Sequence, residues 1–137
     1  MIISDNDAAK RDLLTKARVI AVVGHSDKPD RESYKVGMYL RNAGYTVYPV
    51  NPAVTEIDGQ PSYASLADVP EAIDIVDVFR RPENLPEIVD EAAAVGAKAV
   101  WAQLDVVHEE AARKAAEAGL DVVMDYCIKI EHARLLG

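Results

Sequence analysis

Five short apolar runs recur along the chain, and each is bounded by polar or turn-forming residues. Continuous runs rich in valine and isoleucine predict strands that are buried on both faces, as in a parallel sheet. The predicted strands are Val19–Val23, Thr46–Val50, Asp74–Phe79, Ala99–Trp101 and Asp121–Met124.

Segments between these runs carry apolar residues at helical spacing. In Ser33–Asn42, for example, Val36, Tyr39 and Leu40 share one face, and Ala43-Gly44 ends the pattern. The predicted helices are Asp5–Lys16 with Ser4 as its N-cap, Ser33–Asn42, Glu83–Val95, His108–Ala118 and Ile128–Leu136.

Alternating strands and helices predict an α/β fold, a doubly wound parallel sheet of five strands with helices on both faces. We expect the strand order 2-1-3-4-5. The order 3-2-1-4-5 stays open, because only an irregular stretch, Asn51–Ser62, and a weak element from Tyr63 to Ala72 connect the second and third strands. The chain of 137 residues matches one domain, 1–137, with residues 1–17 as a helical extension.

The charge balance disfavours two classes of partner. With 23 acidic and 15 basic residues, the chain has a formal net charge of −8, whereas nucleic acids and anionic membranes attract basic surfaces. No apolar run approaches the roughly 20 residues that span a bilayer, and the amino terminus lacks the pattern of a signal peptide. Cys127 is the only cysteine, so no internal disulfide forms, and we expect a cytoplasmic protein.

Ligands of doubly wound sheets bind at the carboxyl ends of the strands, and the first such loop begins at Gly24. A glycine there lets a backbone approach a ligand closely. The N–H groups of the following helix suit a phosphate, and Lys28 and Arg31 add positive charge. The alternative is that Gly24 only makes a tight turn, with Ser33 as the N-cap of the helix.

The same loop disfavours NAD and nucleoside triphosphates. The dinucleotide fingerprint requires glycines where Ser26 and Pro29 stand, and an acid after the second strand, where the chain reads Asn51-Pro52. A phosphate-binding loop of the Gly-Lys-Ser/Thr type is also missing.

The next two loops offer further binding candidates. Phe79 and Arg80 follow the third strand, where a ring can stack on a base and a guanidinium can meet a phosphate. Alternatively, Phe79 belongs to the core and Arg80 is solvated. Trp101 and Gln103 end the fourth strand, where the sequence is compatible with a partly open site or with a core tryptophan.

No catalytic or metal-binding constellation is predicted. His25, His108 and His132 lie far apart, only His25 falls in a ligand loop, and metal-ligand spacings are missing. A lone cysteine beside a buried strand, as at Cys127, is most simply a packing residue, with a reactive thiol as the alternative.

Several motifs occur together in a specific order. They are Val22-Val23-Gly24-His25-Ser26, Arg31 with Ser33-Tyr34, Pro49-Val50-Asn51-Pro52, Asp74-Ile75-Val76-Asp77-Val78-Phe79-Arg80, Gly96-Ala97-Lys98-Ala99-Val100-Trp101-Ala102-Gln103, Val123-Met124-Asp125 and Cys127-Ile128-Lys129-Ile130-Glu131-His132. From about Arg18 to Leu135, this arrangement resembles the stand-alone CoA-binding domain proteins of bacteria and archaea. These are relatives of the CoA-binding domain of the succinyl-CoA synthetase alpha subunit.

The resemblance implies a Rossmann-like domain that holds the ADP moiety of coenzyme A (CoA) at the carboxyl edge of the sheet. The residues carried over as cofactor-binding are Gly24, His25, Ser26, Arg31 and Ser33 around the diphosphate, Asn51 and Pro52 at the adenosine, Phe79 and Arg80 beside the site, and Trp101 and Gln103 on its far wall. Three positions depart from the family pattern, which usually has a small residue at His25, a glycine at Asp105 and often an arginine at Tyr126. An acid at position 105 would weaken the binding of a polyanion if it points inward.

We therefore expect a protein that binds CoA or an acyl-CoA without catalysis. In the related synthetases, thioester formation needs a phosphorylated histidine on a further domain and a separate ATP-binding domain. We expect that this chain is too short to hold either domain. Two alternatives remain. One is an enzyme acting on a CoA ester or a nucleotide-like ligand through His25 or Cys127, and the other is a regulatory or interaction domain that binds a protein partner and has an empty pocket.

Overall fold

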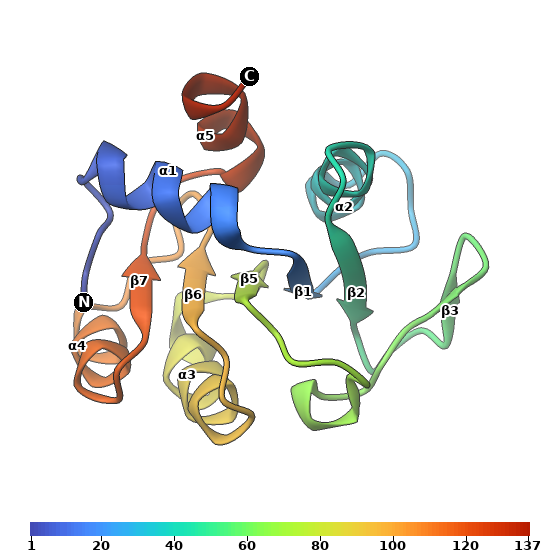
Figure 1. Ribbon diagram of the computed structural model, residues 1–137. Coiled ribbons are helices and arrows are strands. Elements are labelled where there is room, and N and C mark those ends of the chain that lie inside the picture. Colours follow the sequence, from blue (N-terminus) through green and yellow to red (C-terminus); the bar gives the residue numbers. More distant parts are fainter.

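A five-stranded parallel sheet forms the centre of the computed structural model, which describes residues 1–137 (Figure 1). Its strands are β1 (Val19–Val23), β2 (Thr46–Val50), β5 (Ile75–Val78), β6 (Ala99–Ala102) and β7 (Asp121–Val123). They pair in the order β2-β1-β5-β6-β7. This confirms the order 2-1-3-4-5 against 3-2-1-4-5. The order reverses between β1 and β5, which marks their carboxyl ends as the ligand edge.

Helices cover both faces of the sheet. On one face lie α1 (Asp7–Lys16), α2 (Glu32–Asn42) and α5 (Ile128–Leu135), and on the other α3 (Leu85–Ala94) and α4 (Glu109–Glu117) (Figure 1). The connections include the 3₁₀ turns η1 (Leu66–Asp68) and η2 (Pro82–Asn84) and a hairpin of β3 (Glu56–Ile57) and β4 (Gln60–Pro61). None of the helices combines the length and the apolar character needed to cross a membrane.

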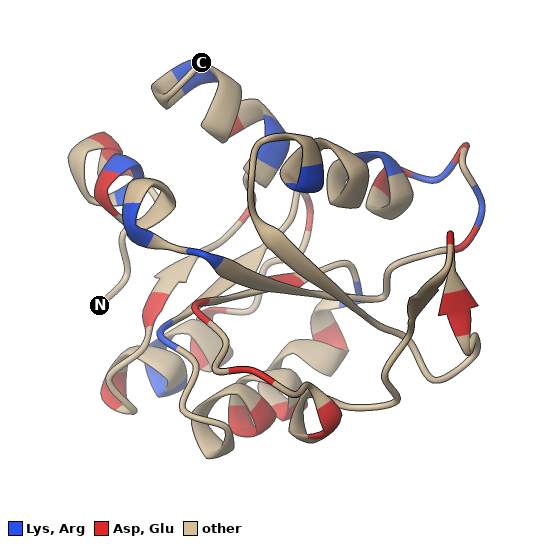
Figure 2. Cartoon of the chain, turned by 45° about the vertical axis from the view of Figure 1, so that its right-hand side comes forward, with Lys and Arg blue, Asp and Glu red and all other residues tan.

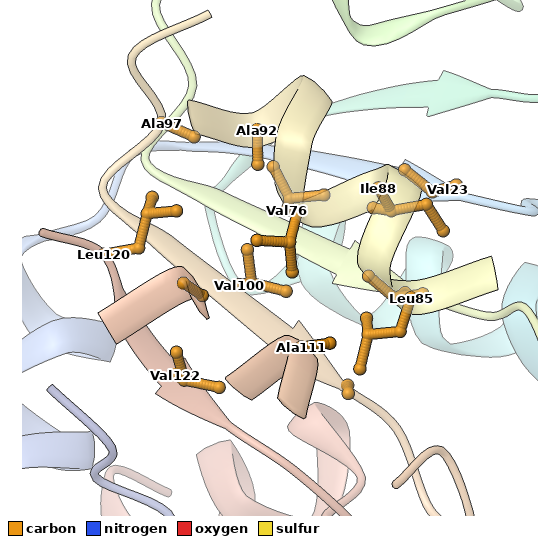
Figure 3. Packing of buried hydrophobic residues seen from close by; sticks show 14 of the residues in the cluster. Val23, Val76, Leu85, Ile88, Ala92, Ala97, Val100, Ala111, Leu120 and Val122 are labelled. Atoms are coloured by element: carbon orange, nitrogen blue, oxygen red, sulfur yellow. The ribbon is translucent and has the colours of Figure 1, made fainter. Parts of the chain in front are cut away.

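An apolar cluster on each face of the sheet joins these layers. Alternate side chains of a strand point to opposite faces, so Val76 packs toward α3 and α4 (Figure 3) while its neighbour Ile75 packs toward α1, α2 and α5. Burying one such aliphatic side chain contributes about 1.5–3 kcal/mol. Both faces of the strands are buried, which explains why the strands appear in the sequence as continuous apolar runs.

Helix α1 is fixed to α5 by a buried ion pair. Lys10 Nζ lies 2.6 Å from Glu131 Oε1 and 3.9 Å from the centre of the Tyr126 ring. On the outside of the pair, Arg134 Nη2 lies 2.7 Å from Asp7 Oδ1 and 2.9 Å from Glu131 Oε1. Removing one partner of a buried pair costs about 3–5 kcal/mol. This network therefore holds the amino-terminal helix against the last helix of the chain.

The prediction that Ser4 caps the first helix is wrong. Helix α1 begins at Asp7, and its N-cap is Asn6, whose Oδ1 accepts a hydrogen bond from Ala9 N at 3.0 Å. Ser4 Oγ instead accepts from Met124 N at 2.9 Å. The Ser4 hydroxyl, which the sequence pattern assigned to the helix cap, is thus hydrogen-bonded to the backbone just after β7.

Candidate functional site

The carboxyl ends of β1, β5 and β6 lie side by side. Beyond the regular strands, Phe79 N donates to Val23 O at 2.9 Å, and Gln103 N donates to Val78 O at 3.4 Å. These bonds continue the parallel ladders by one residue and bring Gly24, Phe79 and Gln103 to the same edge of the sheet.

Three adjoining clefts run along this edge. The central cleft, about 620 Å³, is lined by Glu32, Val36, Phe79, Arg80, Arg81, Pro82, Asn84, Gln103, Leu104, Asp105 and Val106. The loop cleft, about 530 Å³, is lined by Gly24, Ser26, Lys28, Asp30, Arg31, Glu32, Ser33 and Phe79. The side cleft, about 320 Å³, is lined by Val23, Val50, Pro52, Ala64, Ser65, Arg80, Asn84, Glu87, Ile88 and Glu91.

Shared residues join the three clefts into one trough. Glu32 and Phe79 border both the central and the loop cleft, while Arg80 and Asn84 border both the central and the side cleft. The trough therefore crosses the β1–β5 switch point, and it brings together eight of the predicted binding residues. These eight are Gly24, Ser26, Arg31, Ser33, Pro52, Phe79, Arg80 and Gln103.

Gly24 is required by the turn itself. Its φ is +87°, and a Cβ built there would lie 2.2 Å from Phe79 O. Both the left-handed conformation and the close approach to β5 demand a residue without a side chain. Gly24 lines the loop cleft, but the packing of the turn is sufficient to explain the glycine, as in the alternative raised from the sequence.

Hydroxyl groups hold the loop between β1 and α2. Ser26 N donates to Ser33 Oγ at 2.9 Å, and Lys28 N donates to Ser26 Oγ at 3.1 Å. Ser33 is therefore not the N-cap of α2; Arg31 is, and it makes no side-chain capping bond. The leading N–H groups of α2, at the positive end of its dipole, remain available beside the loop cleft.

Acidic and basic residues alternate along the segment between β1 and α2 (Figure 2), and this segment borders the loop cleft. Lys28 and Arg31 line it together with Asp30 and Glu32, so these side chains carry no net charge. Two features favour an anion here. The N-terminus of α2 has no side-chain cap, and the long cationic side chains of Lys28 and Arg31 line the cleft.

His25 does not line any of the three clefts. Its side chain is 1% exposed, and the ring meets Tyr34 edge-on with centroids 6.0 Å apart. Burial lowers the pKa of the imidazole, and Nδ1 lies 2.8 Å from Ser26 O. A carbonyl only accepts, so Nδ1 carries the proton of a neutral ring. The His25 side chain therefore packs beneath α2 and does not line the loop cleft, where the diphosphate is expected.

Asn51 ties the loops together. Its Nδ2 donates to His25 O at 3.0 Å, and its Oδ1 accepts from Ala53 N at 3.0 Å. Both polar ends of the amide are engaged, and the residue lines none of the clefts, whereas Pro52 lines the side cleft. Asn51 thus shapes the expected adenosine loop without bordering the trough.

Of the two residues expected on the far wall, only Gln103 lines the trough, whereas Trp101 lies in the core. Trp101 is fully buried among the residues under α1, α2 and α5, and its Nε1 donates to Tyr126 O at 2.9 Å. It forms no wall of the trough, because its side chain is enclosed by the core. Gln103 does line the central cleft. Cys127, the second reactive group considered, is half-buried and lines none of the three clefts.

Two polar residues escaped the sequence-based prediction, and only the first of them lines the trough. Asn84 ends η2 and joins the central and side clefts; its signal is an amide in a loop at the carboxyl edge. Asp77 is fully buried on β5, and neither carboxyl oxygen has a hydrogen-bond partner. Burial raises its pKa well above the usual range. Its signal is an acid inside an otherwise apolar strand.

Comparisons with known proteins agree with this geometry. The family model described as a CoA binding domain matches residues 18–133. YneT of Bacillus subtilis is 44% identical over 123 residues, which cover 90% of this chain and 91% of YneT. Acetate–CoA ligase (ADP-forming) I of Archaeoglobus fulgidus is 30% identical over 123 residues, which cover 88% of this chain and 18% of the ligase.

A solved structure extends the agreement to the whole fold. A hypothetical protein from Pyrococcus horikoshii OT3 superposes with a TM-score of 0.94 at 43% identity, covering 100% of this chain and 97% of that one. The family match spans most of the sequence, and the shared fold places the strand ends in the same arrangement. The chain therefore belongs to the CoA binding domain family.

Proposed function

We propose that this protein binds CoA or an acyl-CoA in the trough and holds the ADP moiety at the carboxyl edge of the sheet, without catalysing a reaction itself. The observation that carries the proposal is the continuity of the three clefts across the β1–β5 switch point, in a chain of the CoA binding domain family. A trough along several loops suits a long ligand with chemically distinct parts.

The loop cleft suits the diphosphate. The uncapped N-terminus of α2 offers N–H donors and a positive dipole end. Arg31 lines the same cleft, and Arg80 lies where the central and side clefts meet. A guanidinium at each side of the phosphates provides charge-assisted hydrogen bonds.

The side cleft suits the nucleoside. It is bordered by the apolar Val23, Val50 and Ile88 and by Pro52, with Ser65 and Asn84 as neutral hydrogen-bonding groups. Apolar walls with a few polar groups are typical of ligand pockets. The chain has no acid directly after β2 to hold the ribose hydroxyls of NAD, which supports CoA over that dinucleotide.

Asp105 is compatible with this placement. Where the family resemblance leads us to expect glycine, Asp105 has a φ of +66°, and its N–H donates to Asp125 Oδ1 at 2.7 Å. Asp105 lines the central cleft and not the loop cleft. Its charge therefore borders the part of the trough that we do not assign to phosphates.

Calorimetric titration with CoA and with NAD tests the proposal. We expect CoA to bind more tightly than NAD. Tighter binding of NAD, or no binding of CoA at millimolar concentration by the folded protein, would reject it. Native mass spectrometry of the purified protein provides a second test, because a retained CoA or acyl-CoA adds its own mass and identifies the acyl group.

A further inference from the structure

Asp77 places an acid at the centre of the sheet. It lies on β5, where its register partners are Val22 on β1 and Trp101 on β6. The residue is fully buried, and neither oxygen of its carboxyl group has a hydrogen-bond partner. No contact in the folded protein therefore offsets the cost of removing this carboxyl group from water.

The side chain of Asp77 points to the face of the sheet that α1, α2 and α5 cover. Successive residues of a strand point to opposite faces, and the preceding residue, Val76, belongs to the apolar cluster beneath α3 and α4. Asp77 is therefore on the same side as Ile75, in whose cluster both register partners, Val22 and Trp101, also lie.

This face is held by less apolar surface than the opposite one. Its apolar cluster has 12 buried residues, against 20 beneath α3 and α4. The six buried polar or charged side chains also lie on this side; they are Lys10, His25, Ser33, Asp77, Gln103 and Glu131. Regions with fewer buried apolar contacts open locally at a lower free energy than the rest of a fold. The helices α2 and α5, which we call the α2–α5 layer, are therefore the part of the protein that can open while the sheet persists.

No neighbouring charge compensates Asp77. The titratable groups that the surrounding elements bring to this side are Lys10 of α1, His25 after β1, Tyr39 of α2, and Cys127 and Glu131 at α5. Lys10 and Glu131 pair with each other at 2.6 Å. None of these groups is among the causes that shift the pKa of Asp77, which burial alone raises. The carboxyl group is thus neutral while it is buried, and it ionises at neutral pH once water reaches it.

Opening of the layer and ionisation of Asp77 are linked for this reason. In the closed layer the carboxyl group keeps its proton, whereas in an opened layer it has an ordinary pKa of about 3.9. Between these two pKa values, each pH unit favours the opened, ionised form by a further factor of about ten. A rise in pH therefore shifts the equilibrium toward opening, and a fall in pH reverses the shift.

We propose that Asp77 is a proton-linked switch of the folded protein: its neutral carboxyl group keeps the α2–α5 layer closed, and loss of the proton opens this layer locally while the sheet, α3 and α4 stay folded. Val36 of α2 belongs to the cluster beneath this layer and also lines the central cleft, so the opening alters one wall of the trough. The inference does not depend on which ligand the trough binds, and its test uses the protein without a ligand.

Amide hydrogen exchange between pH 5 and pH 8 tests the switch. Protection factors, which correct each amide for its intrinsic exchange rate at each pH, are measured for Val36 and Leu40 in α2 and for Val89 and Ala92 in α3. The α3 amides are the internal reference, because this helix covers the opposite face of the sheet.

Three variants accompany the wild type. Asp77→Asn keeps the size of the side chain and cannot ionise. Asp77→Val replaces the acid by an apolar residue that suits a strand, and it serves if Asp77→Asn does not fold. Asp27→Asn, at an exposed loop position, makes the same chemical change elsewhere and is the matched control.

We expect the α2 amides of the wild type to be less protected than the α3 amides, because the α2–α5 layer opens alone. The ratio of α2 protection in Asp77→Asn to that in the wild type should grow by up to about tenfold per pH unit, and Asp27→Asn should behave as the wild type does. This ratio cancels the contribution of His25, whose lowered pKa favours opening toward acid pH.

Two results would overturn the switch. If α2 is protected as strongly as α3 or more strongly at every pH, the layer does not open on its own. If the ratio between Asp77→Asn, or Asp77→Val, and the wild type stays constant from pH 5 to pH 8, Asp77 is not the group whose proton controls the opening.

Discussion

The imidazole of His25 occupies the space that a side chain at position 37 would need. A Cβ built on Gly37 would lie 2.2 Å from His25 Nε2 and 2.8 Å from Cδ2. The glycine in the middle of α2 and the histidine at the end of β1 are therefore complementary: the missing side chain lets the helix pass over the buried ring. This relationship explains a glycine that helix propensity alone disfavours.

Gly37→Ala should destabilise the protein by up to about 2 kcal/mol, because overpacking costs roughly 1–3 kcal/mol against a helix-propensity gain of about 1 kcal/mol. In a His25→Ala background the same change should stabilise, because the ring that it would strike is gone. Urea unfolding of the four proteins measures both effects. The same sign in both backgrounds would show that the two residues are not complementary.

Arg31→Ala and Arg80→Ala should each weaken CoA binding about ten- to hundredfold, because a hydrogen bond to a charged phosphate contributes about 1.5–3 kcal/mol. Calorimetric titration measures the loss, and circular dichroism checks the fold. Arg113→Ala, on the exposed side of α4, is the control and should bind normally. If both loop variants bind as the wild type does, neither arginine contacts the ligand.

Gly24→Ala should destabilise the fold more than Gly59→Ala does. Both glycines have positive φ, +87° and +81°, but a Cβ at Gly24 would strike Phe79 O, whereas a Cβ at Gly59 would meet nothing within 4 Å. An alanine at positive φ costs of order 1–3 kcal/mol in backbone strain at either position, and Gly24→Ala adds the clash with Phe79 O. Urea unfolding compares the two variants. Equal losses would mean that β5 yields to the new side chain, and the turn would not be what fixes Gly24.

Asp77→Asn should stabilise the protein at pH 7. Burial raises the pKa of Asp77 in the folded state above its unfolded value of about 3.9. The folded state therefore binds the proton more tightly, and this stabilisation is complete below the unfolded pKa and is lost as the pH rises toward the folded pKa. Asn cannot ionise, so it does not incur that loss.

Unfolding free energies at pH 4 and pH 7 measure this difference. The gain of Asp77→Asn over the wild type should shrink toward pH 4, because about half of the carboxyls in the unfolded wild type are protonated there. Asp27→Asn, at an exposed loop position, should show no such trend. A gain of Asp77→Asn that does not change with pH would mean that Asp77 does not titrate on unfolding in this range.

Much of the fold follows from local pattern. The valine-rich runs at β1 and β5 specify buried strands whatever surrounds them, because only a doubly covered sheet removes both of their faces from water. The long connections between consecutive strands, through α2 and then through the β3–β4 hairpin and η1, provide the crossovers that parallel strands need. Parallel strands end at one edge, so the sequence also predicted that Phe79, Arg80 and Gln103 would gather near Gly24, as the trough shows.

The direction of individual side chains was decided only by tertiary packing. His25 lies in the expected loop and Trp101 in the expected strand, but both side chains turn into the core. Gly37 makes room for the His25 ring, and Tyr126 O accepts a hydrogen bond from Trp101. The hydroxyls of Ser4 and Ser33 bond to distant backbone instead of capping helices. A pattern of apolar positions encodes how much surface a segment must bury, whereas the partner of a polar group depends on what distant segments bring within hydrogen-bonding distance.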